Sequence, residues 1–279
     1  MSLIIILLAI FIERVTNFIR PIRNHFWLEN YAQKVMGLLG NNAYIGLITA
    51  VLPIVIITAV MQVLLDNLAF GLGGWIFDLV VLLYCLGDSR LREHIEECYK
   101  FSTNDNDESA SRELLAEHFG VVHPDEMLGA SVFMQAFYRG ALQRLFSVLF
   151  WFVILGPAGC VGYRMIQRLY VHLKNTDMQG AQKFASWLTF VLDWIPARLL
   201  ALSFCLVGHF TDIFSEWCAA FKSKLSDTYQ VLYRCGHVAI KMDENPEPVV
   251  VSAQFDEAYG LVNRSLFIWL VVLALVMLF

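Results

Sequence analysis

Long, nearly uncharged apolar segments recur along this chain of 279 residues and constrain its fold more than any other feature. Residues 43–65, 68–86, 145–163 and 187–210 each approach the roughly 20 apolar residues with which an α-helix crosses a bilayer. Hydrophobic residues make up 58% of the chain and charged residues only 16%, whereas a soluble domain is about half apolar and a quarter charged. The sequence therefore predicts an all-α fold, a polytopic helical membrane protein.

Both ends of the chain carry shorter apolar runs. Residues 3–11 are too few to cross a hydrocarbon core of roughly 30 Å, and the last run, 266–279, is expected to begin near Ala258. The first run has no positive residue before it, and Glu13 and Arg14 stand where a signal peptide has small cleavage-site residues, so we expect it to be retained. The prediction is five to six membrane segments, depending on whether residues 1–19 span.

Lysine and arginine residues predict the orientation. Residues 13–42, 87–144 and 211–264 hold four, six and five of them and share one face, which the positive-inside rule places in the cytoplasm. We expect a single integral-membrane domain over 1–279, with amphipathic helices in a cytoplasmic insertion at about 87–144 and a cytoplasmic segment at about 211–264. The net charge of −5 argues against a nucleic-acid partner.

Ionisable residues inside the apolar segments are candidate functional residues, because a charge within a bilayer faces protein and has a partner. Four stand out: Glu13, Arg14, Asp193 and Arg198. Pro196 lies between the last two, lacks an N–H and favours a break in the helix. One interpretation has Asp193 capping a helix that restarts there, with Arg198 paired to Asp193 or Glu13. The other has a proline kink near the interface, with Arg198 reaching the lipid headgroups.

No sequence motif predicts a catalytic residue, a metal site or a cofactor. The glycines of "GLGG" (71–74) and "GPAGCVG" (156–162) favour close helix packing, with a bend at Pro157. His94 and Cys98 have i, i+4 spacing but lack the second pair that a structural zinc site needs. An enzymatic site would need acids near the membrane ends, and Asp88 with Arg90 closes the third segment on the cytoplasmic side.

Several longer motifs resemble the AmpE/CobD/CbiB membrane family over nearly the whole chain. "LFWFVILGPAGCVGYR" (149–164) and "LDWIPARLLALSFCLVGH" (192–209) are similar to its paired signatures, while "LLAIFIER" (7–14) and "DTYQVLYR" (227–234) resemble the AmpE branch. The resemblance implies one of two functions. The CobD/CbiB branch implies an amide synthase of cobalamin biosynthesis that uses ATP and magnesium. The AmpE branch implies a bacterial inner-membrane protein linked to β-lactamase induction and cell-wall signalling.

Departures from the synthase pattern favour the AmpE branch. Where the resemblance would place acids, amides or a metal-binding carboxylate, this chain has Arg139, Gly140, Gln143, Gln167, Tyr170, Thr189 and Phe190. Magnesium is held mainly by carboxylate oxygens, so the framework is retained without those ligands. Asp193, Pro196 and Arg198 belong to the part that both branches share, which favours an architectural role at the wall of an internal cavity.

The sequence thus predicts a multi-pass regulatory protein of the bacterial inner membrane, associated with the antibiotic response, with a remnant cavity. The alternative is a membrane-bound amide synthase with a reduced active site. Expected partners are membrane lipids, a lipid or cell-wall-derived ligand, a cytoplasmic protein and a second copy in a homodimer. The candidate cavity residues are Glu13, Arg14, Asp88, Arg90, Arg164, Asp193, Arg198 and His209.

Overall fold

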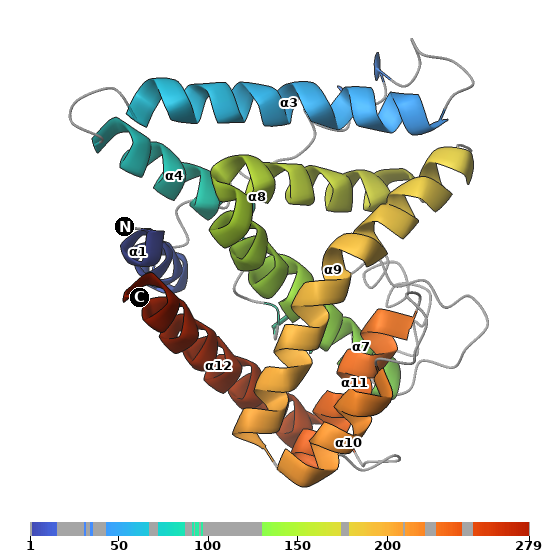
Figure 1. Cartoon of the computed structure of the whole chain (residues 1–279). Helices are drawn as coiled ribbons and strands as arrows, with labels where there is room; N and C mark the ends of the chain where they lie inside the picture. Colours follow the sequence, from blue (N-terminus) through green and yellow to red (C-terminus); the bar gives the residue numbers. More distant parts are fainter. Residues whose placement is uncertain are drawn as a thin grey trace. The chain divides into compact units, whose positions relative to one another are not determined.

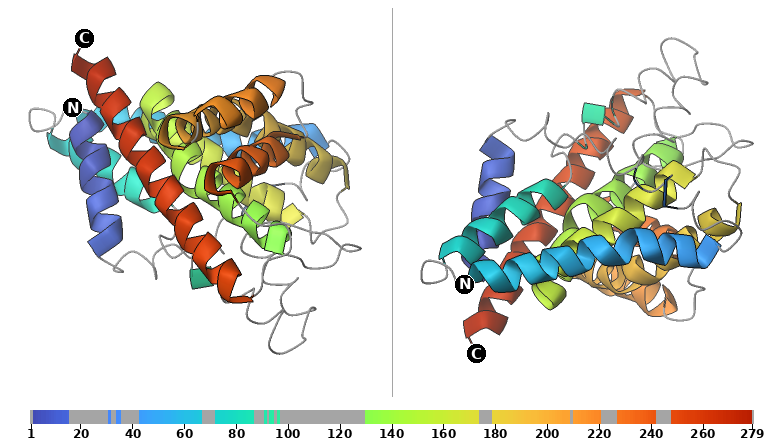
Figure 2. Two further views of the ribbon diagram at one scale, coloured as in Figure 1. Left: turned by 90° about the horizontal axis from the view of Figure 1, so that it is seen from below. Right: turned by 90° about the horizontal axis from the view of Figure 1, so that it is seen from above.

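A computed structural model of the chain describes residues 2–15, 31, 34–35, 43–66, 72–86, 91, 93–94, 96, 130–173, 179–208, 210–220, 227–241 and 248–278. These residues are almost entirely helical, as the sequence predicts (Figures 1 and 2). They group into two compact units. Unit 1 comprises Met1–Asp88 and Ser147–Leu192, and unit 2 comprises Ser89–Phe146 and Asp193–Phe279.

Unit 1 is built from helices α1, α3, α4 and α8 and from the first part of α9. Helix α1 spans Ser2–Val15, α3 spans Ala43–Asp66, α4 spans Leu72–Cys85, α8 spans Ser147–Leu173, and the whole of α9 spans Gln179–Val207. Helices α3, α4 and α8 pack against one another, and α1 packs against α4. The sequence permits this close packing, because a Cβ on Gly162 of α8 would lie 3.1 Å from the Val55 side chain of α3. The predicted packing role of that glycine is confirmed.

Unit 2 contains α7, η3, the rest of α9, α10, α11 and α12. Helix α7 spans Ala130–Ala141, η3 spans Leu142–Phe146, α10 spans Phe210–Ala220, α11 spans Thr228–Ile240 and α12 spans Pro248–Leu278. Helix α11 contacts α7, α10 and α12. Its Gly236 faces the fully buried Tyr138 of α7, and a Cβ there would lie only 2.5 Å from the phenol ring. Any larger residue would push α11 away from α7.

Four described helical stretches are long and apolar enough to cross a membrane. They are Tyr44–Asp66, Ala130–Leu173, Gly180–Val207 and Ala253–Val276. Helices α1 and α4 have only 14 residues each, so the count by length is four, against the five to six predicted. The helical stretch that begins at Ala130 continues through η3 into α8 without a gap in the chain. The last helix begins at Pro248, ten positions before Ala258, since proline suits the first turn of a helix.

Helix α3 displays the apolar surface expected of a membrane protein. Its exposed side chains include Ile45, Ile48, Leu52, Ile56 and Val60, which recur every three or four residues. Such spacing forms one continuous stripe along a helix. A stripe of this kind in water would promote aggregation, whereas lipid acyl chains cover it at no cost.

The bend predicted at Pro157 is confirmed, and the residue before it carries the change of direction. Gly156 has φ 67° and ψ −158°, which interrupts the helical geometry within α8. Only glycine adopts that region readily. Proline also disfavours the helical conformation for the residue that precedes it. The bend is therefore encoded jointly by the Gly156-Pro157 pair.

The restart of the helix predicted in one interpretation at Pro196 is wrong, because α9 is helical from Gln179 to Val207. Proline has no N–H to donate to the carbonyl four residues earlier, which belongs to Leu192. In unit 1 the indole Nε1 of Trp151 donates to that carbonyl oxygen instead, at 3.3 Å. A side chain from α8 thus replaces the missing backbone bond, and the helix continues through the proline.

Candidate functional site

A buried carboxylate forms the centre of the polar interior of unit 2. Asp193 is 0% exposed. Its Oδ2 accepts a hydrogen bond from the Tyr229 hydroxyl at 2.7 Å and another from Gln143 Nε2 at 2.9 Å. Gln143 Nε2 also donates to the Tyr229 hydroxyl oxygen at 2.8 Å. We call these three residues the Asp193 triangle.

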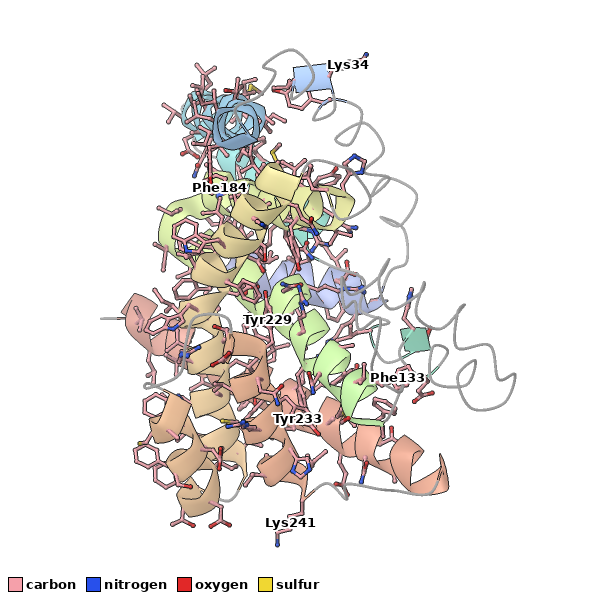
Figure 3. All side chains as sticks on the ribbon, turned by 90° about the vertical axis from the view of Figure 1, so that its right-hand side faces the viewer. Lys34, Phe133, Phe184, Tyr229, Tyr233 and Lys241 are labelled. Atoms are coloured by element: carbon pink, nitrogen blue, oxygen red, sulfur yellow. The ribbon has the colours of Figure 1, made fainter. Side chains whose placement is uncertain are left out.

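Three elements far apart in the sequence supply the triangle. Asp193 comes from α9, Tyr229 from the first turn of α11, and Gln143 from η3, which is a short π-helix. Figure 3 labels Tyr229 on α11. A π-helical turn holds one more residue than an α-helical turn and is frequent at functional sites. The five-residue η3 therefore changes the angular position of Gln143 relative to the apolar residues of α7.

A positive charge lies beside the triangle. The Arg139 guanidinium stands over the Tyr229 ring, 4.3 Å from its centroid. Arg139 is one helical turn before Gln143, so both residues lie on the same face of the α7–η3 helix. A cation over an aromatic face is stabilising, and this one also places positive charge near the buried carboxylate. The burial of Asp193 is thus offset by two hydrogen-bond donors and a nearby guanidinium.

Arg198 occupies a second buried position on α9. Only 5% of its surface is exposed. Its Nη1 donates to the Thr228 hydroxyl at 3.3 Å, and its guanidinium stands over the Trp194 ring at 4.8 Å. This burial contradicts the interpretation in which Arg198 reaches the lipid headgroups. The hydrogen bonds of Asp193 to Gln143 and Tyr229 also differ from the predicted capping of a restarted helix, since no restart occurs.

Cys235 lies on α11 in the same unit and is fully buried. Burial raises the pKa of its thiol to about 12, with smaller contributions from Cys205 and Glu216, and the Arg198 guanidinium opposes the shift. A thiol attacks as its thiolate. The buried environment therefore disfavours the reactive thiolate form of Cys235.

Other predicted site residues lie in unit 1. Arg164 is buried on α8 and donates through Nη1 to Gln167 Oε1 at 2.9 Å. Glu13 is half-buried on α1, while Arg14 is exposed. The predicted set is thus divided between two units. Asp88, Arg90 and His209 lie outside the described residues, so their predicted roles stay predictions.

The sequence reasoning missed Tyr229 as a site residue and treated Arg139 and Gln143 only as departures from another pattern. The i, i+4 spacing of Arg139 and Gln143 ahead of an apolar run was the available signal. Asp78, a carboxylate within α4 whose Oδ1 is buried, was also absent from the predicted site residues. Within the described ranges, no group of three or more His, Cys, Asp or Glu residues is placed to hold a metal ion.

Comparison with known families decides between the branches that the sequence motifs suggest. A model of the family described as "Regulatory signalling modulator protein AmpE" matches residues 1–279. The chain belongs to the AmpE family. It is 23% identical over 221 residues to "Protein AmpE" of Shigella flexneri, which covers 76% of both chains. The resemblance inferred from the motifs is confirmed, and the chain is a membrane protein of this regulatory family.

Members of the cobalamin branch also match, over a shorter length. "Cobalamin biosynthesis protein CobD" of Stutzerimonas stutzeri is 26% identical over 139 residues, 49% of this chain and 46% of that protein. The protein of the same name from Chromobacterium violaceum is 25% identical over 170 residues, 52% of each chain. The chain therefore spans about half the length of these two CobD proteins. No solved structure matches.

Proposed function

We propose that this AmpE-family protein is a multi-pass regulator in the bacterial inner membrane that acts by binding and not by catalysis. It would respond to a lipid or cell-wall-derived ligand and take part in β-lactamase induction and the response to cell-wall stress. Its cytoplasmic segments would pass the signal to a protein partner. The match of the AmpE family over residues 1–279 supports the regulatory role.

The Asp193 triangle is the observation that best supports a non-catalytic function. The Gln143 amide occupies the position where the motif comparison places a synthase carboxylate. Its nitrogen donates to Asp193 at 2.9 Å and to Tyr229 at 2.8 Å. Magnesium needs oxygen ligands, and here an amide N–H is directed at the one carboxylate of the triangle. The arrangement stabilises a buried acid inside the protein and suits a structural centre better than a metal-nucleotide site.

The second candidate is an amide synthase with a reduced site. The matches to two CobD proteins, each over about half of the chain, favour it. The two candidates differ in their ligands, since a synthase must bind a nucleotide with magnesium and a corrinoid substrate. A regulator of the proposed kind binds neither and recognises a lipid or a peptidoglycan fragment.

A thermal-shift measurement on the detergent-purified full chain separates the two. The probes are Mg-ATP, a cobyric-acid-type corrinoid, phosphatidylglycerol and a muropeptide fraction. A ligand that binds only the folded state stabilises it by about 2.7 kcal/mol at 100 times its Kd. A shift with phosphatidylglycerol or muropeptide alone supports the proposal. A shift with Mg-ATP or the corrinoid overturns it in favour of the synthase, and no shift with any probe overturns the ligand-binding role.

A further inference from the structure

Helix α10 has three distinct faces, and one apolar face does not pack into the interior of unit 2. Ile213 is fully buried and Trp217 half-buried, which defines the inner face. Asp212, Ser215 and Ala219 are exposed and form the outer face, whose polar groups are the Asp212 carboxylate and the Ser215 hydroxyl. Between these two faces lies a third one, which is apolar and exposed.

Two stacked aromatic rings form this third face. Phe210 is 50% and Phe214 37% exposed. Their centroids are 5.1 Å apart with an interplanar angle of 13°, and Phe214 stacks in turn on Trp217 at 5.6 Å. Residues four apart lie on one side of a helix, so the rings make a continuous strip along α10. We call Phe210 and Phe214 the aromatic strip.

Contacts with the rest of unit 2 fix the direction in which the strip faces. The Trp217 indole donates to the backbone carbonyl of Arg198 on α9 at 2.9 Å. Gly208, in the turn before α10, lies so close to the Ile213 side chain that a Cβ there would be 2.8 Å from its Cδ1. Helix α10 also packs against α11 (Figure 1). The helix is therefore held in one rotation about its axis, which keeps the strip outside the core.

The position of α10 in the chain indicates what covers the strip. It begins at Phe210, directly after a helix long and apolar enough to span the membrane, which ends at Val207. The last turn of that helix presents Leu206, 59% exposed, as an apolar surface. A span of this kind meets the headgroup region where it ends. Tryptophan and tyrosine are enriched at that depth, and phenylalanine, tryptophan and leucine form the apolar face of helices that lie in the plane of the interface.

We propose that α10 is an interfacial helix whose aromatic strip inserts into the lipid bilayer next to the end of α9. Phe210 and Phe214 lie at the boundary between headgroups and acyl chains, and Asp212 and Ala219 face the water. The helix carries acidic and no basic residues, so its attachment depends on apolar insertion and not on anionic lipid. This surface lies outside the Asp193 triangle and is independent of the proposed ligand.

Site-directed spin labelling of the full chain in phosphatidylcholine nanodiscs tests the proposal. Phe214→Cys is labelled in a background with Cys98→Ser and Cys218→Ser, because Cys218 is exposed and the other described cysteines are buried. Ala219→Cys is the matched control. It is exposed and lies about 140° around the helix from position 214. Power saturation then compares collisions with apolar oxygen and with a water-soluble nickel chelate.

We expect the label at position 214 to collide severalfold more with oxygen than with the chelate, and the label at 219 to show the reverse. Phe210→Cys provides a second probe of the strip should Phe214→Cys fail to fold. Equal access of the chelate at 214 and 219 would overturn the proposal, since the strip would then lie in water. Low access of both reagents at 214 would also overturn it, because a protein surface would then cover the strip.

Discussion

The Asp193 triangle predicts an unusually strong coupling between two side chains within an apolar bundle. Replacing Tyr229 by Phe removes a hydroxyl that donates to Asp193 at 2.7 Å. That distance lies at the upper end of the range for O–H donation to a charged oxygen, about 2.5–2.7 Å. Hydrogen bonds to charged groups contribute about 1.5–3 kcal/mol. Between neutral side chains of membrane helices, the average is only about 0.6 kcal/mol.

A double-mutant cycle measures the difference. Tyr229→Phe should lower the free energy of unfolding by about 1.5–3 kcal/mol in the natural sequence. In the Asp193→Asn background, the amide keeps the shape but not the charge, and the same substitution should cost only about 0.6 kcal/mol. The coupling energy should then be about 1–2 kcal/mol. The assay is unfolding of the purified protein by SDS in mixed micelles, followed by circular dichroism.

Tyr259→Phe is the matched control, because Tyr259 lies on α12 in the same unit and its hydroxyl makes no hydrogen bond within the described part of the chain. We expect it to change the unfolding free energy by less than about 0.5 kcal/mol, as is usual for a substitution away from buried contacts. If Tyr229→Phe costs no more than this control, the reasoning from the bond length is refuted. If Tyr229→Phe lowers the free energy of unfolding equally in the natural sequence and in the Asp193→Asn background, the role of charge is refuted.

Two further predictions concern the backbone of the helices. Gly156→Ala should destabilise the protein by about 1–3 kcal/mol in the same assay, because φ 67° and ψ −158° suit only glycine. Gly260→Ala is the control, because a Cβ at Gly260 meets nothing within 4 Å. This substitution within a helix should stabilise the protein by about 0.5–1 kcal/mol. Trp151→Phe should cost about 1–3 kcal/mol by leaving a carbonyl without its donor. That cost should fall in a Pro196→Ala background, where the backbone N–H returns, and an unchanged cost would contradict the explanation of the unbroken helix.

The membrane class of the fold was predictable because it depends on composition and on the lengths of apolar runs. Those properties are local and need no knowledge of how helices meet. The bend at Pro157 was predictable for the same reason, since proline and the preceding glycine act on their own backbone. By contrast, the effect of Pro196 depended on Trp151, which lies 45 positions earlier in the sequence. A donor supplied by a neighbouring helix cannot be inferred from the proline alone.

The site was predictable only in part. Asp193 and Arg198 were identified as buried polar residues, because charge inside an apolar run is visible in one dimension. Their partners were not identified. Gln143 and Tyr229 are common residue types that become informative only when η3 and the start of α11 bring them to Asp193. The π-helical turn at η3 has no sequence signature comparable to a proline or a glycine, so the direction of Gln143 could not be derived.

The closed geometry of the triangle limits where a ligand can act. Gln143 Nε2 uses both of its hydrogens, one toward Asp193 and one toward Tyr229, and the Tyr229 hydroxyl both donates and accepts. A ligand that entered this centre would have to replace at least one of these bonds with its own. Its binding would then lower the coupling energy between Asp193 and Tyr229 in the double-mutant cycle. A ligand that stabilises the protein and leaves that coupling unchanged must bind elsewhere in the chain, and the triangle is then a purely structural centre.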